Sequence, residues 1–422
     1  MKVNWRVAVF STVLAFAGYQ TAQAQAPSYN ISDSAVQYTS TAYLGNDGCA
    51  VDPTCAADCT DGCTSMGSSC EPWKLFDVNH GCRKIDVGGW ISGGVTVADH
   101  NVNSTAPMPF VNPVNEVLLN QAWLYAERAA DTGGCGFDWG YRIDYVFGAD
   151  GPDTQAFGDG GWDNGWNTNA NYGSAIPQLY GTVAYNNLSV NIGHFYTTIG
   201  YEVVPATGNF FYSHAYTMNY GEPFTHTGFL GQYAANDNLT VYGGYTFGWD
   251  SGFDNFLDAH TFLGGFSFSV SDNVDLTYMT TAGSFGQGLG NIYMHSIVAT
   301  VAMSDNLEYV MQSDYGTNTE LGDATGNEWY GINQYLFYTI NDCWKFGTRY
   351  EIFRDEAGTA GTSRVGNGSE TYSAATMGLN WMPHTNVTVR PELRWDWVNE
   401  NSGAFGGNNS LFTMGVDAIF TF

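Results

Sequence analysis

Apolar and polar residues alternate with a period of two along much of this chain. The stretch 412–422 shows the pattern most clearly. Its even-numbered positions (one parity) hold apolar residues, and its odd-numbered positions (the other parity) hold mostly small or polar residues. Successive side chains of a β-strand point to opposite faces, so this alternation predicts a strand with one apolar and one polar face. The apolar parity contains Met414, Val416, Ala418, Phe420 and Phe422.

Sixteen segments of this kind follow one another after residue 83. We expect strands at approximately 84–99, 118–130, 136–149, 174–186, 187–199, 226–236, 238–250, 259–271, 273–284, 293–304, 306–315, 327–341, 342–353, 371–382, 385–399 and 409–422.

The connections between these strands alternate between short and long. Every second one is a tight turn of Asn and Asp, such as Asn186-Asn187, where left-handed backbone conformations are tolerated. The other connections are long and rich in Gly, Asn and Asp. This alternation over sixteen strands predicts an all-β, transmembrane up-and-down antiparallel barrel, with short periplasmic turns and long extracellular loops. A Greek-key sandwich has no reason to alternate its loop lengths in this way.

Charged residues keep to one parity in several of these segments. In 385–399, Arg394 and Asp396 share one parity, while Trp395 and Trp397 occupy the other. A charge facing lipid at the bilayer midplane costs roughly 2–4 kcal/mol, so we expect the charged parity to face the lumen. The segments 118–130 and 327–341 do not sort cleanly between two faces.

The N-terminus indicates export from the cytoplasm. Lys2 and Arg6 precede an apolar run over 7–17, and the small residues of 22–24 form a cleavage site. We therefore expect a signal peptide at 1–24, a Cys-rich periplasmic segment at 25–83 and an outer-membrane barrel at 84–422. After the signal there is no run of 18 apolar residues, so a transmembrane helix is not expected.

Composition agrees with a lipid-facing barrel. Aromatic residues make up 16% of the chain and charged residues only 13%, about half the usual share. The formal net charge of −28 argues against nucleic acid as a partner, since nucleic acid requires clustered Lys and Arg. The expected partners are outer-membrane lipid and the barrel assembly machinery, for which Phe420 and Phe422 would be the C-terminal signal.

Eight cysteines in an exported chain favour disulfides over a metal site. Six lie close together, and their spacing lacks the paired CxxC geometry of zinc sites. The sequence does not decide how they pair. The disulfide candidates are Cys49, Cys55, Cys59, Cys63, Cys70, Cys82, Cys135 and Cys343.

A family resemblance supports the barrel. The segment from Asn209 to Gly228 resembles the OmpL-like putative β-barrel porin family of bacterial outer membranes, and a weaker similarity extends from about residue 85 to the C-terminus. It includes Gly89-Trp90 and the run 120–125. The resemblance implies an outer-membrane pore and brings no catalytic residues with it. The Cys-rich segment lies outside it.

The long connection 199–226 is the third in the predicted barrel, and in sixteen-stranded general porins that loop narrows the lumen. It is rich in aromatic residues that an exposed loop would not need, so we expect it to pack against the inner wall. The alternative is that the aromatics only stabilise the loop and its carboxylates are solvated. The residues expected at the constriction are Glu202, His214, Glu222 and His226.

Basic residues are confined to the two ends of the barrel sequence, since no Lys or Arg occurs from Ile143 to Trp344. Closure of the barrel would gather them into one basic sector of the lumen: Arg142, Lys345, Arg349, Arg390 and Arg394. The acidic residues expected in the lumen include Asp138, Asp144, Glu308 and Asp314. Inward carboxylates outnumber inward cations, which predicts a mild cation preference. Alternatively, the charges form ion pairs that hold the wall and leave little net field.

These features predict a porin that allows passive diffusion of small hydrophilic solutes and ions. The alternative is a structural or adhesive barrel without an open pore. His194, His214 and His226 with Glu202 or Glu222 are the only enzyme-like grouping, and no HExxH or GxSxG motif supports it. We expect no catalytic activity, cofactor or metal. A homotrimer is suggested only by analogy with sixteen-stranded porins.

Overall fold

The computed structural model describes residues 73–76, 85–102, 107–108, 110, 114–158, 161–169, 171–286, 290–319, 327–356, 364–366, 368–400 and 402–422. The predicted signal peptide, and the predicted Cys-rich segment apart from 73–76, lie outside the described residues.

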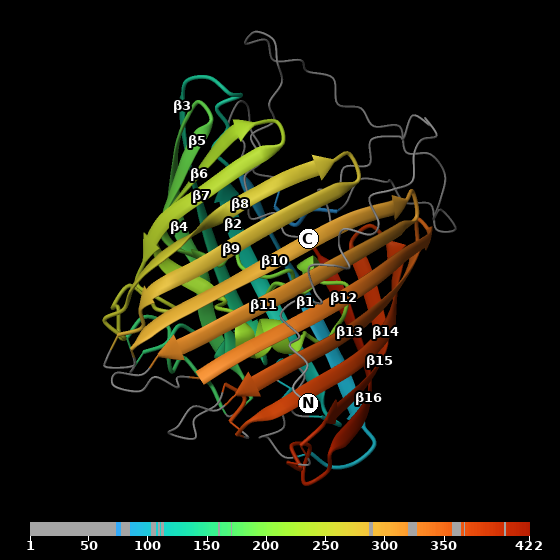
Figure 1. Cartoon of the computed structure of the whole chain (residues 1–422). Helices are drawn as coiled ribbons and strands as arrows, with labels where there is room; N and C mark the ends of the chain where they lie inside the picture. The colour runs from blue at the N-terminus through green and yellow to red at the C-terminus, as the bar shows by residue number, and fades with distance from the viewer. Residues whose placement is uncertain are drawn as a thin grey trace. The chain divides into compact units, whose positions relative to one another are not determined.

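Sixteen antiparallel strands form one closed barrel, and each strand pairs with its neighbours in sequence (Figure 1). The predicted fold class is therefore confirmed. The strands are β1 (Asp86–Ala98), β2 (Val117–Arg128), β3 (Phe137–Gly148), β4 (Gly173–Tyr185), β5 (Leu188–Tyr196), β6 (Thr225–Asn236), β7 (Leu239–Thr246), β8 (His260–Ser271), β9 (Val274–Ser284), β10 (Asn291–Ser304), β11 (Leu307–Thr319), β12 (Asn327–Asn341), β13 (Trp344–Glu356), β14 (Glu370–His384), β15 (Val387–Val398) and β16 (Ser410–Thr421).

The first and last strands close the barrel. Their register runs from Trp90 opposite Thr421 to Ala98 opposite Thr413. Beyond this ladder, the backbones of Gly89 and Phe422 exchange two hydrogen bonds of 2.9 Å. A Cβ atom on Gly89 would lie 2.1 Å from the carbonyl oxygen of Trp123 and 3.0 Å from the Phe422 ring. Glycine at position 89 therefore lets β1 pass between β2 and the C-terminal aromatic.

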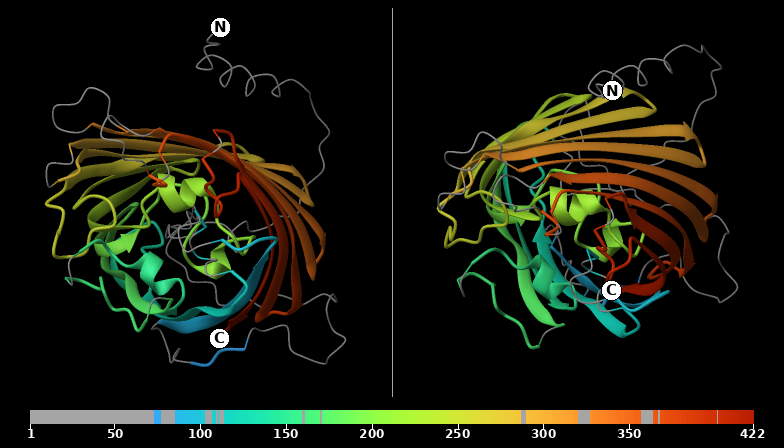
Figure 2. Two further views of the ribbon diagram at one scale, coloured as in Figure 1. Left: turned by 90° about the horizontal axis from the view of Figure 1, so that it is seen from below. Right: turned by 60° about the horizontal axis from the view of Figure 1, so that its bottom comes forward.

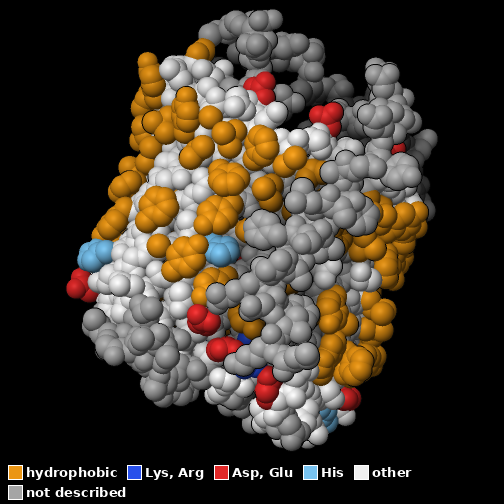
Figure 3. Space-filling model, in the orientation of Figure 1, with side chains coloured by type: hydrophobic (Ala, Val, Ile, Leu, Met, Phe, Trp, Pro, Cys, Tyr) orange, Lys and Arg blue, Asp and Glu red, His pale blue; other side chains and the backbone are white. Residues whose placement is uncertain are grey.

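The outer face of the barrel is apolar, as Figure 3 shows for the side that it views. In β16, Met414 and Phe420 are exposed, whereas Asp417 between them is buried on the lumen side. In β3, Phe137 and Trp139 are exposed in the same way, with fractions of 66% and 51%. The predicted division of apolar and charged parities is thus observed, and it provides the surface that lipid requires. Among the described residues, no helix combines the length and apolar character needed to cross a membrane.

A β-bulge explains why the segment 118–130 did not sort between two faces. The register between β1 and β2 shifts after Ser92, so that Asn120 has no opposite residue. Asn120 and Gln121, although adjacent, are consequently both buried inside the barrel. An extra residue in one strand changes the parity of those that follow.

Inward-facing aromatic side chains explain the other exception, 327–341. Trp329 and Tyr335 of β12 are fully buried inside the barrel. Apolar side chains can occupy the lumen side here because the long connection between β5 and β6 lies inside the barrel and packs against them (Figure 2). The largest buried cluster joins Tyr212 and Tyr216 of this connection to side chains from several strands, among them Leu263, Met279, Trp329, Phe353 and Tyr372.

Candidate functional site: a loop inside the barrel

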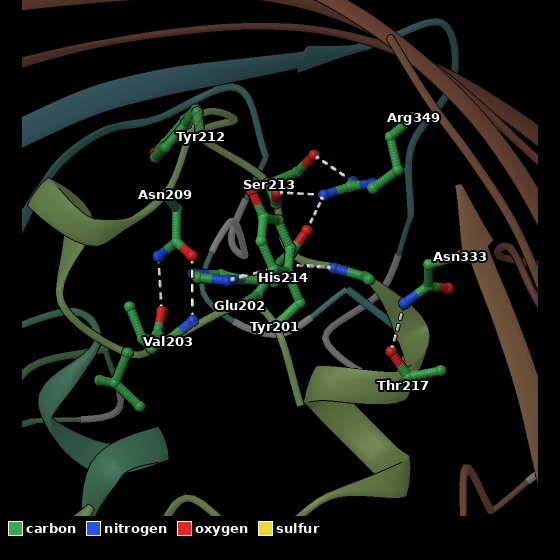
Figure 4. Close-up of polar contacts among 12 residues, drawn as sticks. Tyr201, Glu202, Val203, Asn209, Tyr212, Ser213, His214, Thr217, Asn333 and Arg349 are labelled. Atoms are coloured by element: carbon green, nitrogen blue, oxygen red, sulfur yellow. Dashed lines mark hydrogen bonds and ion pairs between the residues drawn. The ribbon is translucent and has the colours of Figure 1, made fainter. Parts of the chain in front are cut away.

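The connection between β5 and β6, residues 197–224, is the central feature of the lumen; we call it the inner loop. It contains two short helical turns, η3 (Ala206–Gly208) and η4 (Thr217–Gly221). Seen along the barrel, the turns lie within the ring of strands (Figure 2). Asn209 braces the segment around η3, because its side chain donates to Val203 O and accepts from Val203 N at 3.0 Å (Figure 4). This connection corresponds to the segment 199–226 that was expected to pack against the inner wall.

Arg349 of β13 holds the inner loop at its middle (Figure 4). Its guanidinium donates to Glu202 Oε1 at 2.7 Å and to the carbonyl oxygen of Ser213 at 2.8 Å. Glu202 also accepts from Tyr335 Oη at 3.0 Å and from the backbone N–H of Ala215 at 2.7 Å. Burial alone would raise the pKa of the Glu202 carboxyl, but Arg349, with help from His214 and Ala215, holds that pKa at about 2. Glu202 is therefore ionised and is not solvated.

Two further arginines on β15 bind the backbone of the inner loop. Arg390 donates to the carbonyl oxygens of Ala206 at 2.8 Å and Asn209 at 2.7 Å. Arg394 donates to the carbonyl oxygen of His214 at 2.7 Å. Both guanidiniums also pair with buried carboxylates of the wall, at Asp417 (2.6 Å) for Arg390 and Asp396 (2.8 Å) for Arg394.

Wall carboxylates bind the loop's N–H groups. Glu392 of β15 accepts from the backbone N–H groups of Tyr212, at 2.9 Å, and Ser213. Glu351 of β13 accepts from Tyr216 N at 2.7 Å. Three of the predicted basic residues, Arg349, Arg390 and Arg394, thus form a buried hydrogen-bond network with these carboxylates. The three arginines contact the inner loop directly instead of facing it across water.

Glu222, the other predicted loop carboxylate, is also buried, with 3% of its surface exposed. It accepts a hydrogen bond from Gln312 of β11, and the same amide group donates to Asp314 at 2.7 Å. Asp314, one of the acidic residues expected in the lumen, thus lies at the contact between the inner loop and the wall.

The remaining predicted lumen charges lie on the walls of the barrel. Arg142 pairs with Glu127 at 2.7 Å and with Asp144 at 2.8 Å on the β2–β3 wall. Asp138 pairs with Arg128 at 2.8 Å near the short turn. On β13 and β11, Lys345 and Glu308 are only partly buried, on the same parity as Arg349 and Gln312 respectively.

The histidines do not converge on one site. His226 belongs to β6, and its ring nitrogens lie 2.9 Å from Gly248 O and 3.1 Å from Thr197 Oγ1. His194 of β5 contacts Thr227 Oγ1 at 2.7 Å. His214 lies in the inner loop, with Nδ1 3.4 Å from Glu202. Within the described ranges, no group of three or more His, Cys, Asp or Glu residues could hold a metal ion.

Sequence reasoning missed the polar group at the bulge of β2. Gln121 donates to Asp150 at 2.8 Å and to the loop carbonyl of Val204 at 2.8 Å, and Asn120 accepts from Tyr212 Oη at 3.1 Å. Burial raises the pKa of Asp150, which lies in the β3–β4 connection, to about 7. The available signal was the adjacent polar pair inside a strand that did not alternate.

The two predicted disulfide candidates within the described residues lie in short turns. Cys135 is in the turn between β2 and β3, and Cys343 is in the turn between β12 and β13. The other six candidates lie outside the described residues, so the pairing remains a prediction.

A closed barrel of sixteen antiparallel strands, apolar outside and with a charged loop bound inside, defines the class of outer-membrane porins. The chain belongs to the family described as putative beta-barrel porin-2, OmpL-like, which matches residues 84–422. It is therefore a protein of the bacterial outer membrane. No curated protein matches the sequence.

Several solved structures share the fold. OmpT of Vibrio cholerae, expressed in the outer membrane, has a TM-score of 0.53 at 12% identity, over 82% of this chain and 99% of that chain. The outer-membrane channel DcaP of Acinetobacter baumannii has a TM-score of 0.54 at 11% identity, over 80% and 97%. An anion-selective porin from Comamonas acidovorans has a TM-score of 0.54 at 10% identity, over 80% and 99%. At such low identity these likenesses concern the fold alone.

Proposed function

We propose that this porin allows passive diffusion of small hydrophilic solutes and ions, and that the inner loop narrows the passage. The observation that carries the proposal is the anchoring of the loop inside the barrel by Arg349, Arg390 and Arg394. A loop fixed by three buried guanidiniums has one defined position. It can therefore set the size of solute that passes.

Polar side chains on the lumen side of the wall, toward the short turns, support an aqueous entrance. They are only partly buried, and they include Ser189, Asn191, Gln232, Thr240, Ser267, Thr277 and Thr300. Among them lies a cavity of about 20 Å³, lined in part by Ser189, Asn191 and Gln232. Hydroxyl and amide groups without charge suit hydrated, uncharged solutes as well as ions.

We propose a mild preference for cations. The arginines that bind the inner loop are neutralised by buried carboxylates, so they present no free basic surface to the lumen. Apart from the ion-paired charges of the β2–β3 wall, the partly or fully exposed inward charges nearer the short turns include Asp275, Glu308 and Lys345, two negative and one positive. This excess of carboxylate favours cations in the aqueous part of the lumen.

One observation favours the alternative, a structural or adhesive barrel without an open pore. The large buried cluster continues from the inner loop to opposite walls, including Leu263 of β8, Met279 of β9 and Tyr372 of β14. Swelling of liposomes in sugars of increasing size separates the two functions. A porin gives swelling that falls with sugar size, and folded barrels that give none would establish the alternative.

The flanking parts complete the proposal. Residues 1–24 act as a signal peptide, 25–83 form a periplasmic segment, and 84–422 form the barrel. The cysteines form disulfides, and Phe420 and Phe422 engage the barrel assembly machinery. Assembly as a homotrimer is supported by the trimer form of one structural neighbour, OmpT of Vibrio cholerae. Mass mapping of disulfides and the native mass of the purified protein test these points.

A further inference from the structure

Two buried carboxyl groups meet a single amide group where the inner loop rejoins the wall. Gln312 of β11 donates from its Nε2 atom both to Glu222 and to Asp314, the latter at 2.7 Å. Its Oε1 atom accepts from the backbone N–H of Tyr201 at 3.2 Å. Gln312 therefore binds residues near both ends of the inner loop at once.

Glu222 is placed to tie the two ends of the loop together. It directly follows η4 and lies three residues before β6. Its carboxyl group packs on Gly200, where an added Cβ atom would lie only 1.7 Å from Glu222 Oε2. The preceding residue is also fixed, since Trp329 Nε1 of β12 donates to Gly221 O at 3.0 Å. A change in the Glu222 carboxyl thus acts on both ends of the loop.

Among the described residues, no Lys or Arg is among the main electrostatic influences on this carboxyl pair. The groups facing it are Gln312 and Asp314 from β11, Ser296 from β10 and, further away, Glu202 from the loop. Asp314 Oδ1 and Ser296 Oγ are both buried beside the pair.

The nearby guanidiniums are directed elsewhere. Arg349 binds Glu202 at 2.7 Å and Glu351 at 3.1 Å, and Arg364 donates to the carbonyl oxygen of Tyr220 at 2.7 Å. One neutral amide cannot offset two buried negative charges. Burial, and then the neighbouring Asp314, raise the pKa of Glu222 well above its ordinary value.

We propose that Glu222 and Asp314 share one proton, and that this proton is a pH-sensitive latch that fixes the inner loop to β11. A proton suits the pair better than a metal ion, because the N–H groups of Gln312 already point at both carboxylates. When the pH rises, loss of the proton leaves two like charges in a buried place. The latch then opens, the ends of the loop leave β11, and the passage widens.

Infrared spectroscopy of the full-length protein in lipid, recorded across a pH series, detects the proton itself. The wild type should show a C=O band of a protonated carboxyl group that persists above the pH at which solvated carboxyl groups ionise. Glu222→Gln and Asp314→Asn should each remove the component of this band that comes from the pair, whereas the component from Asp150, whose pKa is raised to about 7, should stay. The control Asp237→Asn, which removes an exposed carboxylate in the β6–β7 turn, should leave the band unchanged.

An identical spectrum for the wild type and Glu222→Gln would overturn the shared proton. A calcium-dependent shift of carboxylate bands in the wild type that is lost in Glu222→Gln would also overturn it, because a metal ion would then occupy the site.

The gating half of the inference rests on the proposed porin function and is tested by conductance across the same pH series. The wild type and Asp237→Asn should show an increase in conductance as the pH rises. Glu222→Gln should lose this step and keep the low conductance throughout, because an uncharged amide keeps the latch closed. Equal pH profiles for the wild type and Glu222→Gln would overturn the latch while the porin stands. If no variant conducts, the porin function fails and the latch as a gate fails with it, whereas the infrared result still decides the shared proton.

Discussion

Arg349 on β13 and Glu202 in the inner loop form a buried ion pair, with Nη1 and Oε1 2.7 Å apart. They are separated by 147 positions in the sequence. The pair joins the barrel wall to the first part of the loop, and both side chains are almost completely buried, at 0% and 5% exposure. The position of the loop therefore depends on a contact between segments that are far apart in the sequence.

Replacing Arg349 with Met should detach the middle of the inner loop. Glu202 would keep a buried charge without its partner, and such a change costs about 3–5 kcal/mol. The denaturant midpoint of the refolded barrel should fall, and single-channel conductance should become larger and noisier. The double variant Arg349→Met/Glu202→Gln should recover much of the stability, since no charge is then left unpaired. A single variant as stable as the wild type would contradict the anchoring role.

Acid should weaken the same contact. The pKa of Glu202 is lowered from its ordinary value of 4.5 to about 2, so the ion pair stabilises the folded state above pH 4.5. This stabilisation, on the order of 3 kcal/mol, is lost as the pH falls from 4.5 through about 2. Unfolding midpoints measured between pH 7 and pH 2 should show the loss in the wild type and a smaller one in Glu202→Gln. If the unfolding midpoint depended on pH equally in both proteins, the stabilising role of the ionised Glu202 would be contradicted.

The fold was predictable because lipid places opposite demands on the two faces of every strand. Alternation and Asn-Asp turns located all sixteen strands, with the expected segment 342–353 corresponding to β13 at Trp344–Glu356. The exceptions also have physical causes. The bulge at Asn120 shifts the parity of β2, and the inner loop allows Trp329 to face the lumen.

The candidate site was predictable only as a set of residues. The pattern placed Arg349 in the lumen and Glu202 in the inner loop, but it did not show that they touch. Whether charges face each other across water or pair directly depends on the path of the loop. That path is set by contacts from distant strands, such as Gln121 with Val204 and Asn333 with Thr217.

Charge substitutions in the aqueous part of the lumen should shift ion selectivity in opposite directions. Asp275→Asn combined with Glu308→Gln should lower the preference for cations, because both remove inward carboxylates that are not fully buried. Lys345→Gln should raise it. Reversal potentials under a salt gradient measure both effects. The same direction of shift in both variants would show that these residues do not line the conducting path.

Gly200 should not tolerate a side chain. Its φ of +90° favours glycine, and a Cβ atom would clash with the Glu222 carboxyl group. Gly200→Ala should therefore disturb the base of the inner loop and lower the unfolding midpoint, as strain in such a conformation costs about 1–3 kcal/mol. Gly181→Ala is the matched control, since its Cβ atom would meet only one backbone oxygen at 3.9 Å. Equal stability of the two variants would contradict the close packing at Gly200.

The central claim is that this barrel conducts through a lumen narrowed by the inner loop and biased by carboxylates. Single-channel recording of the refolded mature protein in a planar bilayer under a KCl gradient tests it most directly. Stepwise conductance with a reversal potential that favours K⁺ is expected. A folded barrel without conductance would contradict the porin function, and a preference for Cl⁻ would contradict the acidic lumen.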